Sequence, residues 1–120
     1  MSTAQEDRYG KTPAGASKPP CVAATTAAIT LSGEQTIDDI AVVEGDRVLV
    51  KDQATGSEDG IYECSAGAWS RVNDWNASDD LISGVTVPVA GGTANGLKIF
   101  MITYSGDYTV DSTSITATPI

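Results

Sequence analysis

Short apolar and β-branched stretches, separated by turn residues, recur throughout residues 21–120. Residues 47–51 read RVLVK, and successive side chains of a strand point to opposite faces, so both faces of this strand carry apolar atoms. Residues 61–65 and 68–72 flank Ala66-Gly67, a two-residue hairpin signal. About eight or nine short strands, with turns about every 8–12 residues, predict an all-β domain, a small β-sandwich or barrel. The predicted strands cover residues 28–31, 36–43, 47–51, 61–65, 68–72, 85–89, 98–104, 108–110 and 114–118.

The sequence also indicates where some of these strands lie in a sheet. Residues 47–51 and 98–104 are predicted to be central strands, because the first is apolar on both faces and the second is the most apolar run. Pro88 has no amide hydrogen, so residues 85–89 are predicted to form an edge strand or a bulge. Residues 73–83 are polar and irregular, and we expect no more than one short helical turn there.

The composition supports the all-β prediction. The chain of 120 residues contains 14 Thr, 11 Ser and 12 Gly, but only four Leu. A helical domain of this size would carry more Leu and less Thr, whereas Thr, Val and Ile favour half-buried pleated surfaces. The length is that of one domain.

The charge balance excludes several classes of partner. Acidic residues number 16 and basic residues 7, which gives a formal net charge of −9. Nonspecific nucleic-acid binding and docking on anionic membranes both need positive charge. The chain lacks histidine, which excludes Ser-His and Cys-His nucleophile pairs. We find neither an apolar run of membrane-spanning length nor a secretory leader, and therefore expect synthesis in the cytoplasm.

Residues 1–20 differ from the rest of the chain. They contain three prolines and no Val, Ile, Leu, Phe or Trp, and their side-chain charge is +1 against −10 for residues 21–120. Such a segment is either a disordered tail or an arm that becomes ordered on a neighbouring subunit. We predict an extended N-terminal arm, followed by a single β domain. The candidate partner-binding residues of the arm are Arg8, Tyr9, Lys11, Pro13, Lys18, Pro19 and Pro20.

Carboxylates offer the first candidate chemistry, and we interpret them as solvated turn charges. Asp38-Asp39, Glu58-Asp59 and Asp79-Asp80 are adjacent pairs, and neighbours on a strand point to opposite faces. A calcium site within residues 52–59 or 73–80 is an alternative, because oxygen ligands gather there without the EF-hand spacing. We predict no metal, no cofactor and no enzymatic activity.

Thiols and aromatic rings also have a structural interpretation. Cys21 and Cys64 could form a disulfide that fixes the arm, but a reducing cytoplasm favours two free thiols. The rings are expected in the core, with Trp69 and Tyr62 on paired strands. The alternative is a carbohydrate-binding module for host recognition, which needs several rings exposed on one face. Those rings would be drawn from Trp69, Trp75, Tyr104 and Tyr108.

Residues 24–53 and 56–71 carry a more specific signal. They read ATTAAITLSGEQTIDDIAVVEGDRVLVKDQ and GSEDGIYECSAGAWSR. This resembles a module of tailed-bacteriophage virion proteins, especially tail fibres and tailspike-like proteins. That module typically reads ATTxNITLSGxQTIDGVxVxxGDRVLVKDQ and then ENGIYxVxxGAWTR. The present chain has Asp39 where the module often has Gly. The matching residues include turn pairs and expected core positions, namely Ile37, Val48, Val50, Ile61 and Trp69.

The resemblance implies a virion structural protein and transfers no catalytic residue. A short chain with an arm is expected to be a capsid decoration or cement protein, a homotrimer whose arm ties neighbouring subunits and whose partner is the major capsid protein. It would be assembled in the host cytoplasm and located in the virion. The alternative is a tail-fibre or tail-adaptor subunit whose arm anchors it to tail proteins.

Overall fold

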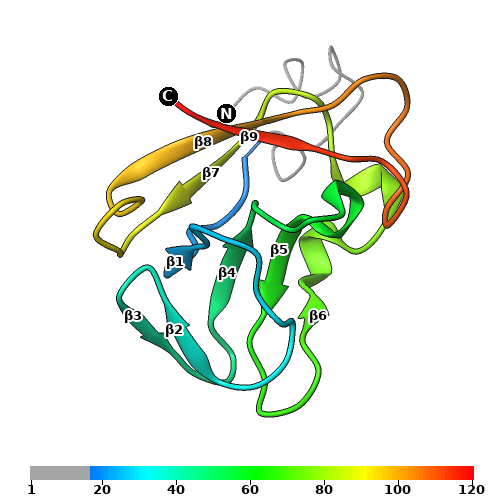
Figure 1. Cartoon of the computed structure of the whole chain (residues 1–120). Coiled ribbons are helices and arrows are strands. Elements are labelled where there is room, and N and C mark those ends of the chain that lie inside the picture. Colours follow the sequence, from blue (N-terminus) through cyan, green and yellow to red (C-terminus); the bar gives the residue numbers. More distant parts are fainter. Residues whose placement is uncertain (1–16) are drawn as a thin grey trace, which may run out of the picture.

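Nine strands in three sheets make up the computed structural model of the protein, which describes residues 17–120 (Figure 1). Helical structure within this range is limited to three single 3-10 turns, so the all-β prediction is confirmed. None of the helices in the described residues is long and apolar enough to cross a membrane. The strands are β1 (Ala23–Ala24), β2 (Gln35–Ile37), β3 (Ile40–Val42), β4 (Arg47–Val50), β5 (Gly60–Glu63), β6 (Ser70–Arg71), β7 (Val85–Val89), β8 (Lys98–Thr103) and β9 (Thr116–Pro119). The 3-10 turns are η1 (Gly56–Glu58), η2 (Asn73–Trp75) and η3 (Ser78–Asp80).

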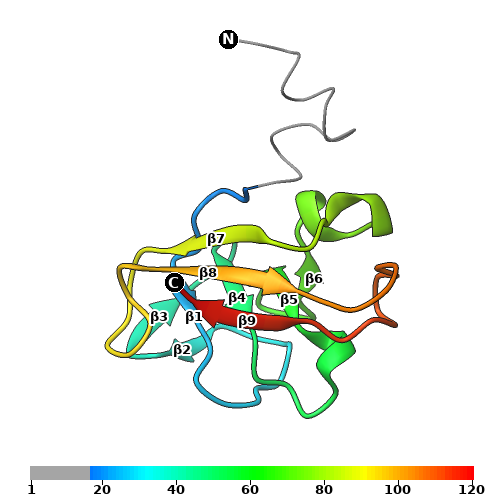
Figure 2. The same ribbon diagram turned by 90° about the horizontal axis from the view of Figure 1, so that it is seen from above.

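The middle layer is the sheet with strand order β1-β4-β5-β6, and β4 is central in it, as predicted. Its two faces are buried against different layers. Val48 and Val50 share a core with Ile37 of the β2–β3 hairpin. Leu49 belongs to a second core, together with Phe100 of β8. The alternation of RVLVK thus buries apolar side chains on both sides of one strand, and the fold has three layers (Figures 1 and 2).

The third layer is the antiparallel sheet β7-β8-β9. β8 is the central strand and β7, which contains Pro88, is an edge strand. Both positions agree with the predictions from the sequence. Val85 and Val87 of β7 lie opposite Ile102 and Phe100 of β8, and all four side chains are buried. One face of this sheet therefore packs on the middle layer.

The predicted continuous strand over residues 36–43 is wrong, because β2 and β3 form a hairpin there. Asp38 and Asp39 make the turn with φ of 48° and 69°. Positive φ at both central residues is typical of the type I′ turn, and Asp tolerates the left-handed region better than most residues. The turn places Ile37 opposite Ile40 on one face of the hairpin, although these residues are three positions apart and would point to opposite faces of one continuous strand.

The structure also corrects two other predicted strands. Residues 28–31 form none, because the side-chain amide of Gln53 bonds both the N–H and the C=O of Ile29, at 2.8 and 3.0 Å. Residues 108–110 form none either, and the Tyr108 hydroxyl accepts a hydrogen bond from Trp75 Nε1 at 2.8 Å. The polar connection after β6 contains two 3-10 turns, η2 and η3, where we expected no more than one helical turn.

Candidate interaction surface

The described chain begins as an added strand-like segment beside the edge strand β7. Ser17 and Cys21 form parallel bridges to Thr86 and Val89. Lys18 N donates to the Thr86 carbonyl and Cys21 N to the Pro88 carbonyl, each at 2.9 Å. We call residues 17–21 the arm root, because they join the predicted arm to the domain.

A buried lysine anchors the arm root. The side chain of Lys18 is only 3 % exposed, and its Nζ donates to the carbonyls of Asp74 and Asp80, each at 2.5 Å. Burial lowers the pKa of Lys18, while the nearby carboxylates of Asp74 and Asp80 oppose that shift. Those carbonyls belong to η2 and η3, so the lysine joins the start of the described chain to the connection after β6.

An ion pair supports the same region from the middle sheet. Arg47 Nη1 and Nη2 donate to the two carboxylate oxygens of Asp74, at 2.7 and 3.1 Å. Arg47 Nη2 also donates to the carbonyl of Pro19 at 3.2 Å. Burial would raise the pKa of Asp74, but the hydrogen bonds and charge of Arg47 outweigh it, and the pKa lies below its usual range. The arm root is therefore held by β4, β7 and η2 together.

These contacts revise the role of one predicted partner-binding residue. Lys18, which the sequence assigned to the arm as a partner contact, is buried inside the domain and serves as its anchor. Pro19 and Pro20 are exposed on the arm root. The other candidates, Arg8, Tyr9, Lys11 and Pro13, lie outside the described residues. Residues 17–20, which the sequence assigned to the arm, lie against the domain in the described part of the chain.

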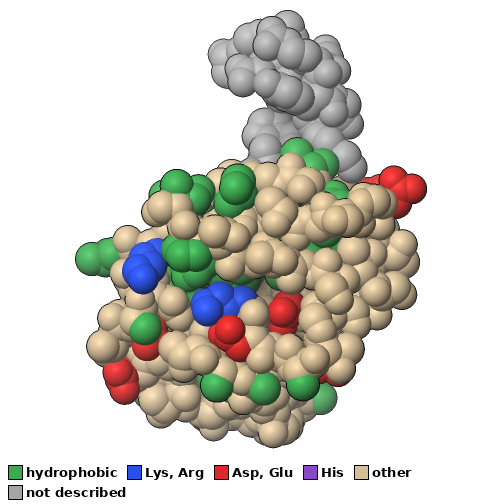
Figure 3. Space-filling view, turned by 45° about the horizontal axis from the view of Figure 1, so that its top comes forward, with side chains coloured by type: hydrophobic (Ala, Val, Ile, Leu, Met, Phe, Trp, Pro, Cys, Tyr) green, Lys and Arg blue, Asp and Glu red, His purple; other side chains and the backbone are tan. Residues whose placement is uncertain are grey.

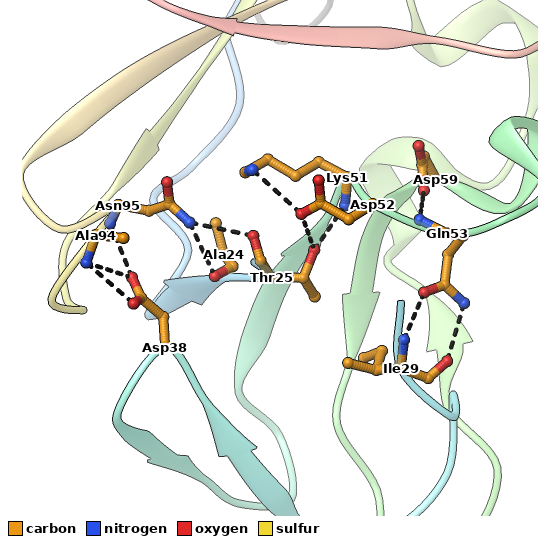
Figure 4. Close-up of polar contacts among 10 residues, drawn as sticks. All are labelled: Ala24, Thr25, Ile29, Asp38, Lys51, Asp52, Gln53, Asp59, Ala94 and Asn95. Atoms are coloured by element: carbon orange, nitrogen blue, oxygen red, sulfur yellow. Dashed lines mark hydrogen bonds and ion pairs between the residues drawn. The ribbon is translucent and has the colours of Figure 1, made fainter. Parts of the chain in front are cut away.

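The KDQ end of the motif builds a polar network at the end of β4 (Figure 4). Lys51 N donates to Thr25 Oγ1, which donates to Asp52 Oδ2, both at 3.0 Å. Lys51 Nζ pairs with the same Asp52 oxygen at 3.1 Å. Gln53 holds Ile29 through the two bonds described above (Figure 4). The Gln53 amide thus supplies hydrogen-bond partners for the backbone N–H and C=O of Ile29, in the irregular segment after β1.

The network extends to the hairpin and to the β7–β8 turn (Figure 4). The Asp38 carboxylate accepts the backbone N–H groups of Ala94 and Asn95, the latter at 2.8 Å, and these bonds lower its pKa. Asn95 is buried, and its Nδ2 donates to the carbonyls of Ala24 and Thr25 at 3.2 and 3.1 Å. Asp38 of the motif and Asn95 of the β7–β8 turn thus tie the three layers together.

Asp59 is the one carboxylate with a strongly raised pKa. Its side chain is buried, and its Oδ1 accepts the N–H of Gln53 at 3.0 Å. Burial, with smaller contributions from the charges of Asp52 and Glu58, raises its pKa to about 6 despite that hydrogen bond. Arg71 donates to the backbone carbonyl of Asp59 at 3.1 Å, so Asp59 lies in a packed turn beside β5.

The two thiols are free and buried, as the reducing-cytoplasm argument predicted. Cys21 and Cys64 belong to different cores, and burial raises the pKa of both, that of Cys21 to about 12. A raised pKa keeps a thiol protonated and poorly nucleophilic. Within residues 17–120, we find no group of three or more acidic or thiol side chains placed to hold a metal ion.

The aromatic rings do not form the exposed row that carbohydrate binding required. Trp75 is fully buried, and Trp69 and Tyr108 are only 7 % exposed. Trp69 Nε1 donates to the Gly33 carbonyl at 2.9 Å, and Tyr104 packs its ring against that of Tyr108 at 5.3 Å. The rings are core residues, so the carbohydrate-binding alternative loses its basis.

Comparisons of the chain with family models, with curated proteins and with solved structures found no match. The case for a function therefore depends on the residues themselves and on the surfaces that they build.

Proposed function

We propose that this protein is a structural subunit of a tailed-bacteriophage virion, a decoration protein that binds the outside of the capsid. Its partner is the major capsid protein, and the subunit assembles as a homotrimer. Residues 1–16 extend from the arm root onto a neighbouring subunit, and many modest contacts stabilise the shell collectively.

The anchored arm root is the observation that carries this proposal. Lys18 and Arg47 hold residues 17–21 on the domain, so any contact made by residues 1–16 is transmitted to the folded body. Sixteen residues span at most about 53 Å when extended. The domain measures 42 Å along its longest axis. An arm of that length reaches past its own domain to a neighbour.

The residues that resemble the phage module support a structural role. In the structure they form β1 to β6 and the polar network, where their side chains pack or bond other parts of the same domain. A motif used in this way specifies a fold. A motif that specifies a fold and contains no reactive site is expected in a structural module of an assembly.

A tail-fibre or tail-adaptor subunit is the second candidate. The observation in its favour is the resemblance itself, because the module is most typical of tail fibres and tailspike-like proteins. In that case the arm root would lead residues 1–16 into the tail.

The copy number per particle separates the two. We would measure it by quantitative peptide mass spectrometry on purified particles, with the major capsid protein and a tail protein as internal standards. A ratio near one to one or one to two with the capsid protein is expected for decoration. A ratio below about one in twenty would move the protein to the tail. Absence from the particles would contradict both roles.

A matched pair of variants then tests the arm. The double variant Arg8→Glu, Lys11→Glu reverses the arm charge and is expected to reduce the copy number. Lys98→Glu, a charge reversal of half that size at an exposed body lysine, is expected to leave the copy number unchanged.

A further inference from the structure

The side of the β7-β8-β9 sheet that faces away from the core carries no charged residue. Alternation along the strands and the pairing register define this outer face. It consists of Thr86, Pro88, Ile99, Met101, Thr103, Thr116, Thr118 and Ile120. Four of the five large hydrophobic residues exposed in the described chain are Ile99, Met101, Ile120 and the adjacent Leu97.

This composition is unusual for the molecule. Residues 21–120 carry 18 charged side chains, yet the three strands contain only Lys98, at the start of β8 and on the opposite set of positions. Exposed strands of monomeric proteins usually carry charges that prevent association. In Figure 3 the upper part of the view is mostly green and tan, and most blue and red side chains lie lower or at its margin. The outer face has the character of a contact surface.

The edges of the sheet offer little to an added strand. The arm root occupies the edge of β7 through its bonds to Thr86 and Pro88. On β9, Ile120 N donates inward to Ile99, and antiparallel alternation then turns Ala117 and Pro119 outward. Pro119 has no N–H, so Ala117 is the outward residue of β9 that can still donate to a new strand. The face is therefore the larger contact surface of the sheet.

The occupant of the face is constrained by charge and by chain direction. The arm root runs parallel to β7, and its first residue, Ser17, lies beside Thr86 near the Val85 end. The most exposed apolar side chains of the outer face itself, Ile99 and Ile120, lie at the other end, near Pro88. A charged partner would find no complementary group on the face. For two copies that each carry −9, an uncharged face permits close approach without opposed carboxylates.

We propose that copies of this chain associate through this outer face, each burying Ile99, Met101 and Ile120 against the same face of another copy. Three strands about 4.8 Å apart, with about 20 Å of β8, give a face of roughly 300 Å². A standard interface buries about 800 Å² per partner. The association is therefore weak in solution and becomes effective where copies are held side by side. It does not depend on the virion role and is tested on the purified protein.

Sedimentation velocity on the full-length chain tests the proposal, over concentrations from tens of micromolar to about one millimolar. The weight-average mass is expected to rise with concentration. Ile99→Asp and Ile120→Asp are each expected to lower the association constant at least about tenfold, because a carboxylate would face an apolar surface. Val43→Asp is the matched control, since Val43 is 50 % exposed and lies after β3, outside this sheet.

Several results would overturn the inference. One is a monomer mass at every concentration. Another is association that both face variants leave intact while circular dichroism shows them folded. A third is association abolished by Arg8→Glu, Lys11→Glu but not by the face variants, which would make the arm the occupant. Contact between identical faces is two-fold symmetric, so the limiting mass is expected to be that of a dimer. A limiting mass of three copies would contradict pairing through this face.

Discussion

Replacing the buried carboxyl of Asp59 is expected to stabilise the protein at neutral pH. The folded-state pKa of about 6 lies above the ordinary value of 3.8. Unfolding therefore releases Asp59 from a site that disfavours its charge. The penalty is absent below about pH 3.8, grows as the pH rises, and is complete above about pH 6.

The magnitude follows from the size of this difference. At about 1.4 kcal/mol per pKa unit, it corresponds to about 3 kcal/mol as an upper limit. Glu58 is exposed and Asp52 only half-buried, so solvent screens the contribution of their charges to the raised pKa of Asp59. We therefore expect removal of the Asp59 charge to raise the free energy of unfolding by about 1–2 kcal/mol. Asp59→Asn keeps an oxygen that can accept the Gln53 N–H, and the phage module that this chain resembles reads Asn at this position.

Urea denaturation followed by tryptophan fluorescence, at several pH values from about 3.5 to 8, measures the effect. Asp59→Asn is expected to raise the free energy of unfolding at pH 7 and to leave it unchanged near pH 3.5. Asp107→Asn, at an exposed loop carboxylate, is the control. A variant that is less stable at pH 7, or a gain that persists at pH 3.5, would refute the reasoning.

Three further predictions concern the contacts that hold the domain together. Lys18→Met leaves the Asp74 and Asp80 carbonyls without a donor and is expected to cost about 2–4 kcal/mol in urea denaturation, whereas exposed Lys98→Met should cost little. Tyr108→Phe removes the acceptor of buried Trp75 Nε1 and should cost about 1–2 kcal/mol, and a value near zero would mean that the bond contributes nothing. Asp38→Asn removes a carboxylate whose lowered pKa stabilises the fold above its unfolded-state pKa. Its denaturation midpoint should fall at pH 7 and approach that of the unchanged protein as the pH drops through the folded-state pKa of Asp38.

Much of the fold could be predicted because the order of apolar and polar residues along a strand shows which of its faces are buried. RVLVK identified a strand buried on both faces, and Pro88 identified an edge strand. The reversal at Asp38-Asp39 was missed although Ile37 and Ile40 are three positions apart, a spacing that breaks the alternation of one continuous strand. The Gly that often stands in place of Asp39 in the module that this chain resembles was a further signal, since φ there is positive.

The surface was harder to predict than the core. The apolar run of β8 correctly indicated a central strand. A central strand has a neighbouring strand on each side, but this pairing leaves one face of the sheet uncovered. Ile99 and Met101 are therefore exposed, although their run is the most apolar in the chain. Lys18 was assigned to the arm from the composition of residues 1–20, and only the three-dimensional position of two carbonyls accounts for its burial.

The parallel alignment of the arm root with β7 determines how the domain responds to mechanical tension. A pull on residues 1–16 away from the domain acts along the strand direction, past Thr86 and the Val85 end of β7. The two backbone bonds, from Lys18 N and Cys21 N, then share the force in shear, together with the Lys18 side chain. A perpendicular pull would instead open the same bonds one after another. The domain should resist a pull along its arm far better than a peeling force.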